Sequence, residues 1–213
     1  MHKPKPPGEA PRPSRPGTAV RTKGQQRVQE ILDAAAAVIV DDGYAGFTLR
    51  RIAELTGISL SNLQYYFTNK EALLQAMMAR EFDRSVAEME ALTDRPGATP
   101  KARFLLAIDY VLKYQEQTSS CALFWELWAM SVREPTVSPI MDTFYDQYMR
   151  RITELIRDLS PSLGRSKAQR RAGVIVSLLE GASLLRGAGK PRRTTLAGFE
   201  KEIRETCLTL ASA

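Results

Sequence analysis

The stretch TLRRIAELTGISLSNLQYYF, residues 48–67, contains two runs of hydrophobic residues at helical spacing, separated by a glycine. This pattern predicts two short helices joined by a turn. Ala53 is small enough for the second helix to approach closely, Gly57 can take a left-handed backbone conformation, and Leu63 can pack inward. The spacing of these three residues indicates a helix-turn-helix.

The second of these helices separates into two faces when its residues are placed at about 100° intervals. One face is an apolar stripe of Leu60, Leu63 and Phe67. Ser59 caps the helix. The opposite side of the helix carries Ser61, Asn62, Tyr65 and Tyr66, and Gln64 lies at the border between the two sides. Asparagine and glutamine amides can read adenine in the major groove, and hydroxyls and helix N-termini bind phosphates. The pattern favours a recognition helix, and a short surface helix with half-buried tyrosines is the alternative.

Residues 47–74, FTLRRIAELTGISLSNLQYYFTNKEALL, resemble the DNA-binding domain of the TetR (tetracycline-repressor-like) family. The family pattern is T-x-x-x-I-A-x-x-x-G-[VI]-S, followed by Y-x-F-x-x-K-x-x-L. The matching positions are Thr48, Ile52, Ala53, Gly57, Ile58, Ser59, Tyr65, Phe67, Lys70 and Leu73. The resemblance covers Gln29 to Leu74, and the rest of the chain agrees only in length and helix count.

The resemblance implies a homodimer that sets two recognition helices into successive major grooves of a near-palindromic operator. It implies phosphate contacts for Thr48 and Lys70, base-edge contacts for Ser61, Asn62 and Gln64, and contacts of Tyr65 and Tyr66 with phosphates or a thymine methyl. Arg50, Ser59, Arg21 and Lys23 complete the candidate DNA-binding set. Many members have a tyrosine where this sequence has Gln64, so an amide that can read a base replaces an aromatic contact there.

The rest of the sequence predicts helices and no sheet, which makes the protein all-α with about nine helices. They are expected at about 25–40, 49–55, 60–67, 69–93, 101–118, 121–132, 137–159, 167–186 and 195–211, and the first should stop at Asp41–Gly43. Thr68 followed by Glu71 predicts a capping box before the fourth helix. We expect a disordered basic, proline-rich arm at 1–22, a helix-turn-helix domain at 23–70, and a ligand-binding and dimerisation domain at 71–213.

A candidate ligand pocket lies around CALFWELWAMSVR, residues 121–133, where two tryptophans share a helical face near one acidic residue. The candidate lining residues are Phe104, Ile108, Trp125, Glu126, Trp128, Phe144 and Tyr148. A carboxylate surrounded by aromatic rings would suit a cationic ligand. The alternative is that the tryptophans are core residues and that Glu126 pairs with Arg133 or faces water.

The last two helices are the expected association surface. Gly173, Ser177 and Gly181 form a stripe of small residues four apart. The expected dimer interface consists of this stripe with Leu185, and of a narrow apolar row of Leu196, Phe199, Ile203, Cys207 and Leu210. Two helices from each subunit would then form a four-helix interface, as the resemblance also implies.

Charge is concentrated at the N-terminus: residues 1–24 hold six basic residues and one acidic residue, in a chain of 213 residues with net charge +6. This arm is either a solubilising leader or an arm that follows DNA phosphates or enters a minor groove.

The sequence disfavours an enzyme. His2 is the only histidine, Cys121 and Cys207 are far apart, and no catalytic, nucleotide-binding or zinc-binding motif is present. We expect no cofactor and no metal. No apolar run approaches the roughly 18 residues of a membrane span, so a cytoplasmic location, in the bacterial cytosol or nucleoid, is expected.

The predicted function is a transcriptional regulator, a repressor that an unidentified small molecule releases from DNA. An activator and a helical architectural DNA-binding protein without a ligand are the alternatives.

Overall fold

The computed structural model describes residues 16–212, with side chains from Lys23 onward. In this part of the chain the backbone forms nine α-helices, one short 3-10 helix and no strand, which confirms the expected all-α fold. The elements are α1 (Pro16–Gly46), α2 (Leu49–Thr56), α3 (Leu60–Tyr66), α4 (Lys70–Thr93), α5 (Pro100–Tyr114), α6 (Thr118–Ser131), α7 (Ser138–Leu159), α8 (Arg165–Arg186), η1 (Thr194–Leu196) and α9 (Phe199–Ser212).

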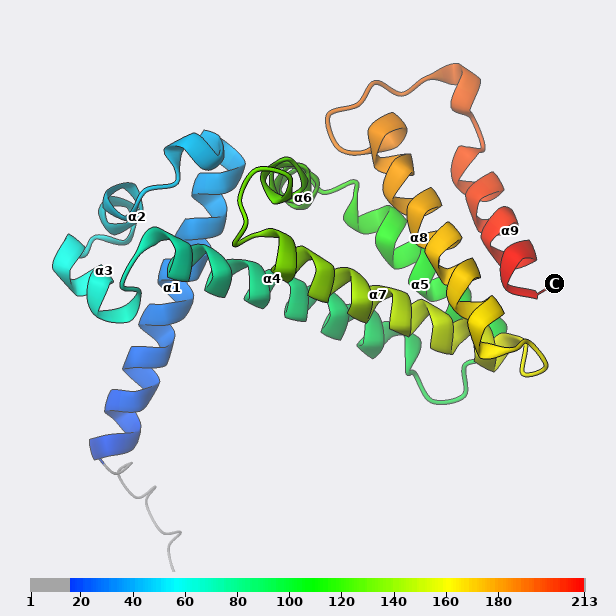
Figure 1. The fold of residues 1–213 in the computed structure, drawn as a ribbon, viewed down its shortest axis with the longest axis horizontal. Coiled ribbons are helices and arrows are strands. Elements are labelled where there is room, and N and C mark those ends of the chain that lie inside the picture. Colours follow the sequence, from blue (N-terminus) through cyan, green and yellow to red (C-terminus); the bar gives the residue numbers. More distant parts are fainter. Residues whose placement is uncertain (1–15, 213) are drawn as a thin grey trace, which may run out of the picture.

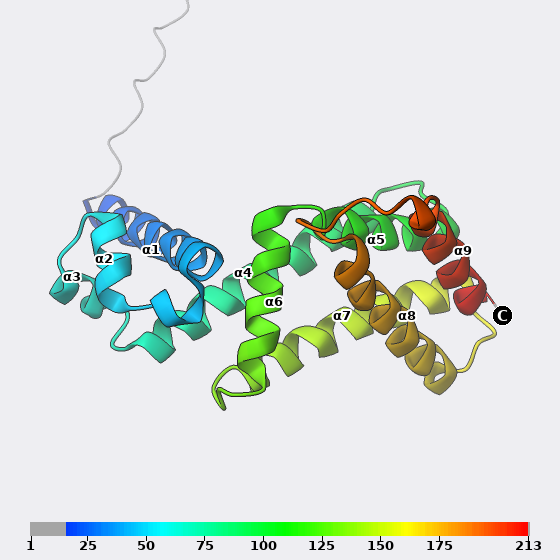
Figure 2. The ribbon, with the colours of Figure 1, turned by 90° about the horizontal axis from the view of Figure 1, so that it is seen from above.

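The helices form a small N-terminal group and a larger C-terminal group that share one long helix (Figure 1). Helices α1, α2 and α3 pack together at one end, and α5, α7, α8 and α9 pack at the other. Helix α4 runs from the first group into the second, and α6 crosses between them, packed on α1 on one side and on α7 on the other (Figure 2). Two helices therefore connect the groups physically.

The helix-turn-helix forms from local signals that the sequence carries. Thr48 caps α2 by accepting a hydrogen bond from the Arg51 N–H, and Ser59 caps α3 by accepting one from the Asn62 N–H. Gly57 ends α2 in the left-handed region, at φ 65°. Ala53 and Leu63 are buried, as their spacing predicts.

Gly43 interrupts α1 close to its C-terminal end. Its φ of 64° and ψ of −175° lie outside the helical region, so the chain turns there and Phe47 enters the core with no exposed surface. A left-handed φ is easily reached only by glycine, because a Cβ would crowd the following carbonyl oxygen. The predicted stop of the first helix at Asp41–Gly43 is confirmed by this turn.

The predicted capping box before α4 is wrong. Asn69, not Thr68, is the N-cap: its Oδ1 accepts a hydrogen bond from the Ala72 N–H at 2.8 Å. Helix α4 begins at Lys70, so Thr68 lies one position too early, and asparagine caps helices as well as threonine does. Glu71 then lies in the first helical turn, where a carboxylate is favoured by the helix dipole.

Part of the expected disordered arm is helical. Helix α1 begins at Pro16, so residues 16–22 are helical. Proline suits the first position of a helix because it lacks an N–H that would have no partner there and because its φ is already helical. Residues 1–15 and the side chain of Arg21 lie outside the described residues, so the expected DNA contact of Arg21 stays a prediction.

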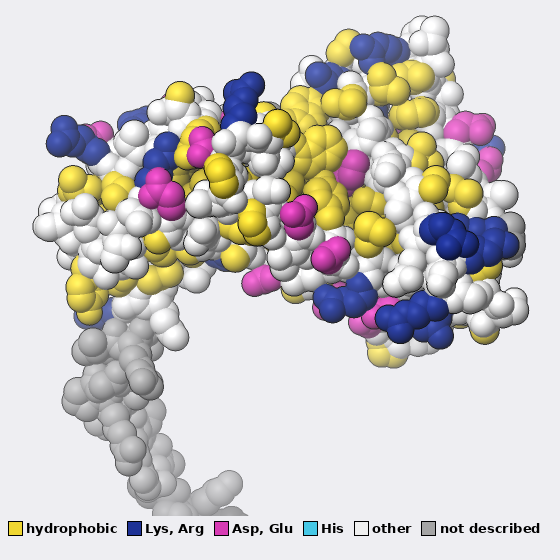
Figure 3. All heavy atoms as spheres, in the orientation of Figure 1, with side chains coloured by type: hydrophobic (Ala, Val, Ile, Leu, Met, Phe, Trp, Pro, Cys, Tyr) yellow, Lys and Arg dark blue, Asp and Glu magenta, His cyan; other side chains and the backbone are white. Residues whose placement is uncertain are grey.

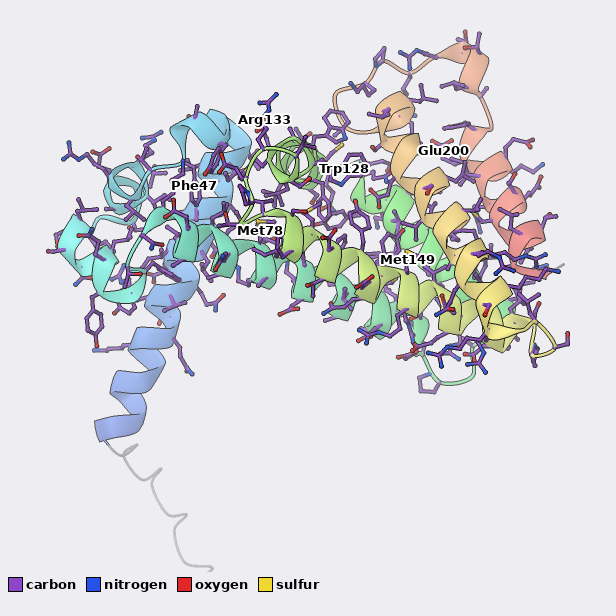
Figure 4. All side chains as sticks on the ribbon, in the orientation of Figure 1. Phe47, Met78, Trp128, Arg133, Met149 and Glu200 are labelled. Atoms are coloured by element: carbon purple, nitrogen blue, oxygen red, sulfur yellow. The ribbon has the colours of Figure 1, made fainter. Side chains whose placement is uncertain are left out.

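Helix α4 contributes to the cores of both groups. Its N-terminal residues Leu73, Met77 and Met78 are buried with α1, and Phe82 and Met89 are buried further along the same helix. The labelled side chains of Phe47 and Met78 lie in the N-terminal group in Figure 4. The expected boundary at residue 70 thus coincides with the first residue of a helix that belongs to both groups. None of the helices described here combines the length and hydropathy of a membrane span.

Candidate DNA interface and ligand pocket

Helix α3 exposes polar side chains to solvent and buries one leucine against the rest of the N-terminal group. Leu63 has no exposed surface, whereas Ser61, Asn62 and Gln64 are exposed. Tyr65 is 83% exposed, which does not fit the alternative of a half-buried packing residue. Its ring meets that of the partly buried Tyr66 edge to face, at 5.2 Å between centroids. The exposed face can therefore meet base edges in a groove.

The caps of α2 and α3 keep hydroxyl hydrogens available for phosphates. The Thr48 hydroxyl oxygen accepts from the Arg51 N–H at 3.2 Å, and that of Ser59 accepts from the Asn62 N–H at 3.1 Å. The Ser59 and Ser61 hydroxyls also lie 3.0 Å apart. Because a hydroxyl is donor and acceptor at once, a capping hydroxyl can still donate to a phosphate oxygen. Arg50, also predicted to contact DNA, is exposed beside Thr48.

A groove between α1 and α3 adds basic groups to this surface. Lys23 and Arg27 of α1 line the groove together with Tyr65 and Tyr66 of α3. The fold thus brings Lys23, predicted from its position before the first helix, next to α3. Arg27 was not predicted, and in the structure it pairs with Glu30 at 2.6 Å.

Lys70 differs from its expected role. Its ammonium lies 3.7 Å from the centroid of the Tyr44 ring and 3.5 Å from the Tyr44 carbonyl oxygen. The side chain is partly buried and makes a cation–π contact within the N-terminal group. A phosphate contact by Lys70 stays a prediction, and the structure gives Lys70 a second role in holding α4 against the end of α1.

The larger group contains an aromatic pocket lined by residues of α4, α5, α6, α7 and α8, with a cavity volume of about 40 Å³. Its lining includes Trp125, Trp128, Phe144 and Tyr148, four of the seven candidate ligand residues. The other aromatic lining residues are Tyr110, Tyr114 and Phe124. Hydrophobic side chains gather where α6 and α7 approach α8 (Figure 3), and Trp128 lies between α6 and α8 (Figure 4).

Three of the candidate ligand residues do not line this pocket. Phe104 and Ile108 are fully buried in the core. Glu126 lies toward α1, and its Oε1 is 3.9 Å from the position that a Cβ on Gly43 would occupy. The reason is the helical period: Cys121, Phe124, Trp125 and Trp128 form the pocket face of α6, and Glu126 lies about 150° around the helix from the centre of that face.

The carboxyl group of the pocket belongs to Glu180, which the sequence analysis did not select. Glu180 is on α8, and burial raises its pKa from 4.5 to about 7 because the carboxylate loses its hydration. A sequence signal for it exists. Glu180 follows the buried Val176 by four residues and precedes the buried Ser183 by three, so helical spacing places it beside the buried stripe of α8.

Two buried polar atoms of residues that line the pocket have no hydrogen-bond partner in the described part of the chain. They are Oε1 of Gln115 and the hydroxyl of Tyr148. Burying such a group without a partner costs about 1–3 kcal/mol, and native proteins retain few of them. Both groups belong to residues that line the same pocket.

The expected dimer surface on α8 and α9 is partly exposed. Ser177, Gly181 and Leu185 are exposed, and Gly173, Phe199 and Leu210 are partly buried. Val174 and Leu184 are more than half exposed and extend the apolar surface of α8. Ile203 and Cys207 point the other way: they are 2% and 0% exposed, because this face of α9 packs inside its own subunit, on α5, α7 and α8.

Two family models match the chain. Residues 31–77 match the model of bacterial regulatory proteins of the tetR family. Residues 100–210 match the model of the C-terminal region of BetI-type transcriptional repressors. The first match falls on the helix-turn-helix group and the second on α5 to α9, which include four of the five helices that line the pocket.

Related proteins agree with both matches. An uncharacterized HTH-type transcriptional regulator in the dhlA 5' region of Xanthobacter autotrophicus is 31% identical, over 76% of this chain and 80% of that protein. The HTH-type nicotine-responsive transcriptional repressor HdnoR of Paenarthrobacter nicotinovorans is 26% identical, over 78% and 86% of the two chains. A solved TetR transcription regulator from Haloarcula marismortui shares the fold, with a TM-score of 0.69 and 21% identity over 88% of this chain and 97% of that chain. The chain therefore belongs to the TetR family of bacterial regulatory proteins.

Proposed function

We propose that this DNA-binding regulator is a homodimeric repressor that leaves a near-palindromic operator when a small organic cation enters the aromatic pocket. The observation that carries the regulatory half of the proposal is the position of α6. One face of this helix lines the pocket, and the helix also packs against α1 of the DNA-binding group. A ligand that moves α6 therefore acts on the group that carries α3.

The DNA-binding half rests on the exposed side chains of α3. Asn62 and Gln64 supply amides for base edges, and the groove with Lys23 supplies positive charge near the tyrosines. In a dimer, two such helices would meet half-sites one helical turn, or a multiple of a turn, apart. A ligand that prefers a conformation with a different separation of the two helices would release the DNA.

The cationic character of the ligand is supported by the pocket lining. Seven aromatic rings and one carboxyl group, that of Glu180, surround the space. Aromatic faces attract cations through their quadrupoles, and a carboxylate supplies the counter-charge. The relative that responds to nicotine, an organic amine, agrees with this chemistry.

Two alternatives carry less support. An architectural DNA-binding protein without a ligand has no use for a pocket that keeps two buried polar atoms unpartnered. An activator is less well supported than a repressor, because the C-terminal half matches a repressor model.

The test begins with selection of bound sequences from a random duplex library by the purified protein. We expect enrichment of an inverted repeat, and enrichment of no sequence would contradict the proposal. The anisotropy of a fluorescent duplex carrying the enriched site then reports release by added cations, with nicotine and N-methylpiperidine as probes and the uncharged tert-butanol as the control. Release by the cations alone is expected, and equal release by tert-butanol would overturn the cationic assignment.

A further inference from the structure

We propose that the ligand of the aromatic pocket is a protonated amine that carries at least one N–H, and that quaternary ammonium ions are poor ligands. This proposal rests on the ligand-responsive function argued above and adds a chemical requirement to it. The requirement comes from the balance of hydrogen-bond donors and acceptors around the pocket.

Gln115 contributes an acceptor. The side chain is 7% exposed, and its Nε2 donates to the Leu179 carbonyl oxygen at 2.9 Å. Because a carbonyl oxygen can only accept, this bond fixes which end of the amide is the nitrogen and leaves Oε1 as the end without a partner. Oε1 has no exposed surface, so neither water nor a ligand reaches it in this conformation, and a ligand N–H can donate to it only after the pocket opens.

The indole donors of the pocket are already used inside the protein. Nε1 of Trp125 donates to the Ser183 hydroxyl at 3.3 Å, and Nε1 of Trp128 donates to the Tyr145 hydroxyl. Tyr148 remains the one hydroxyl without a partner, and it can donate or accept. Together with Glu180, the lining therefore offers more acceptors than donors, which disfavours anionic and acceptor-rich ligands.

The acceptor and the negative charge lie near each other. Gln115 is hydrogen-bonded to the backbone of Leu179, the residue directly before Glu180, and both side chains line the same space. A ligand that satisfies both must carry its donor and its positive charge close together. The N–H of a protonated amine places the two on one atom, whereas a quaternary nitrogen has the charge and no donor.

The protein itself places an ammonium group on one of these rings. The Nζ of Lys190, in the loop after α8, lies 4.5 Å from the centroid of the Trp125 ring. This contact shows that the ring of Trp125 can hold an N–H-bearing cation. A ligand amine bound in the pocket would make the same cation–π contact with the Trp125 ring and would also donate to the acceptors that line the pocket.

The experiment compares two cations of nearly equal shape by isothermal titration calorimetry with the full chain at pH 8. N-Methylpiperidine is protonated at this pH and carries one N–H, and N,N-dimethylpiperidinium carries none. An unpartnered buried acceptor is costly, so we expect the N–H compound to bind about tenfold or more tightly. Equal or tighter binding of the quaternary ion would overturn the inference, and so would the absence of binding by both ions at millimolar concentration.

Three variants separate the contributions of the Gln115 acceptor and the Glu180 charge to ligand affinity. Gln115→Met should bring the affinities of the two ions to within about twofold of each other. Glu180→Gln should weaken both by about tenfold, since it removes the counter-charge. Glu126→Gln changes the nearby acidic residue that faces α1, and both affinities should stay as in the unmodified protein. A preference that survived in Gln115→Met would overturn the role of its Oε1, and thermal unfolding of each variant establishes that it is folded.

The outcome is independent of the test of function. If the quaternary ion binds as tightly as the amine and also releases the operator, the ligand-responsive function stands and the N–H requirement fails. If the amine binds with the expected preference and the operator is not released, the requirement stands and the proposed function fails.

Discussion

Arg80 on α4 forms an ion pair with Asp33 on α1, with 2.8 Å between Nη1 and Oδ1. The same guanidinium donates to the Gln29 carbonyl oxygen at 3.2 Å and pairs with Glu81, a carboxylate only 3% exposed. Arg84 holds the other oxygen of Glu81. A chain of charges thus joins α1 to α4. Arg84 and Glu81 also line a groove with Tyr114, and Tyr114 lines the aromatic pocket as well.

Arg80→Met should loosen this connection. The substitution removes the ties to α1 and leaves the buried Glu81 with Arg84 alone, so we expect the free energy of unfolding to fall by about 1–3 kcal/mol. Hydrogen exchange of the α1 amides should quicken. Arg95→Met, in the exposed turn after α4, is the control and should change the free energy by less than about 0.5 kcal/mol. Equal effects of the two substitutions would contradict a structural role for Arg80.

Asn62→Ala should weaken binding to the selected operator by about 1–3 kcal/mol, because an amide that reads a base edge is lost. Binding to random DNA should change little, since phosphate contacts are retained. Anisotropy titrations at one fixed salt concentration on both duplexes measure the difference. Equal losses on the two duplexes would show that Asn62 does not read sequence.

Gly43→Ala should destabilise the protein by about 1 kcal/mol, because a side chain is placed at φ 64°. The nearest atom to the new Cβ would be Glu126 Oε1 at 3.9 Å, so strain rather than a clash is the cause. Gly24→Ala is the matched control in the same helix, where a Cβ meets open space and where alanine should stabilise by up to about 1 kcal/mol. Chemical denaturation of both variants should give effects of opposite sign, and effects of the same sign would contradict the account of Gly43.

Glu180 should make stability depend on pH in a defined direction. Its folded pKa of about 7 lies above the ordinary 4.5, so the folded state binds the proton more tightly. The resulting stabilisation is fully present below about pH 4.5 and is lost as pH rises through about 7. Glu180→Gln should remove this dependence, which makes the variant more stable than the unmodified protein at pH 8 by about 3 kcal/mol.

Denaturation at pH 4.5, 6 and 8 measures this dependence, with Glu126→Gln as the control. The titratable groups near Glu180 are Tyr145 and Tyr148 on α7 and Cys121 on α6. All three have raised pKa values because burial disfavours their charged forms, so they stay neutral across this range. A pH profile that is the same in Glu180→Gln and the unmodified protein would contradict the assignment.

Leu184→Glu should dissociate the proposed dimer. Leu184 is 57% exposed on the face of α8 that carries Ser177 and Gly181, and a carboxylate there would be buried against its counterpart. Val132→Glu, on a residue 86% exposed at the end of α6, is the matched control and should leave the dimer intact. Sedimentation at micromolar concentration distinguishes the two, and an unmodified chain that is a monomer would refute the dimer itself.

Local signals made the helix-turn-helix predictable. The caps at Thr48 and Ser59 and the left-handed Gly57 depend on neighbours within four residues, and the inward position of Leu63 follows from the period of one short helix. The prediction of the α4 cap was wrong because Thr68 and Asn69 are both good capping residues, and the residue at which the helix begins decides between them. The exposed face of α3 follows from the same local reasoning.

The pocket residues were only partly predictable. Trp125 and Trp128 share a helical face, and that face turned out to line the pocket. Which acidic residue accompanies them depends on how α6 and α8 are rotated against their neighbours. Helical spacing alone led to the prediction of Glu126 as the acidic residue of the pocket, and Glu180 was not predicted. The same holds for α9, where Ile203 and Leu210 belong to one apolar row in sequence and differ in burial.

The sequence by itself determined the all-α fold, the limits of most helices and the exposed polar face of α3, because these depend on propensities, caps and periods within one helix. Tertiary structure alone decided that Glu180 joins the aromatic rings, that Glu126 faces Gly43 and that Arg80 ties α4 to α1. These are contacts between residues more than 30 positions apart, and the relative rotation and spacing of whole helices sets them. No single helix encodes that rotation, since it results from the packing of all the side chains between the helices.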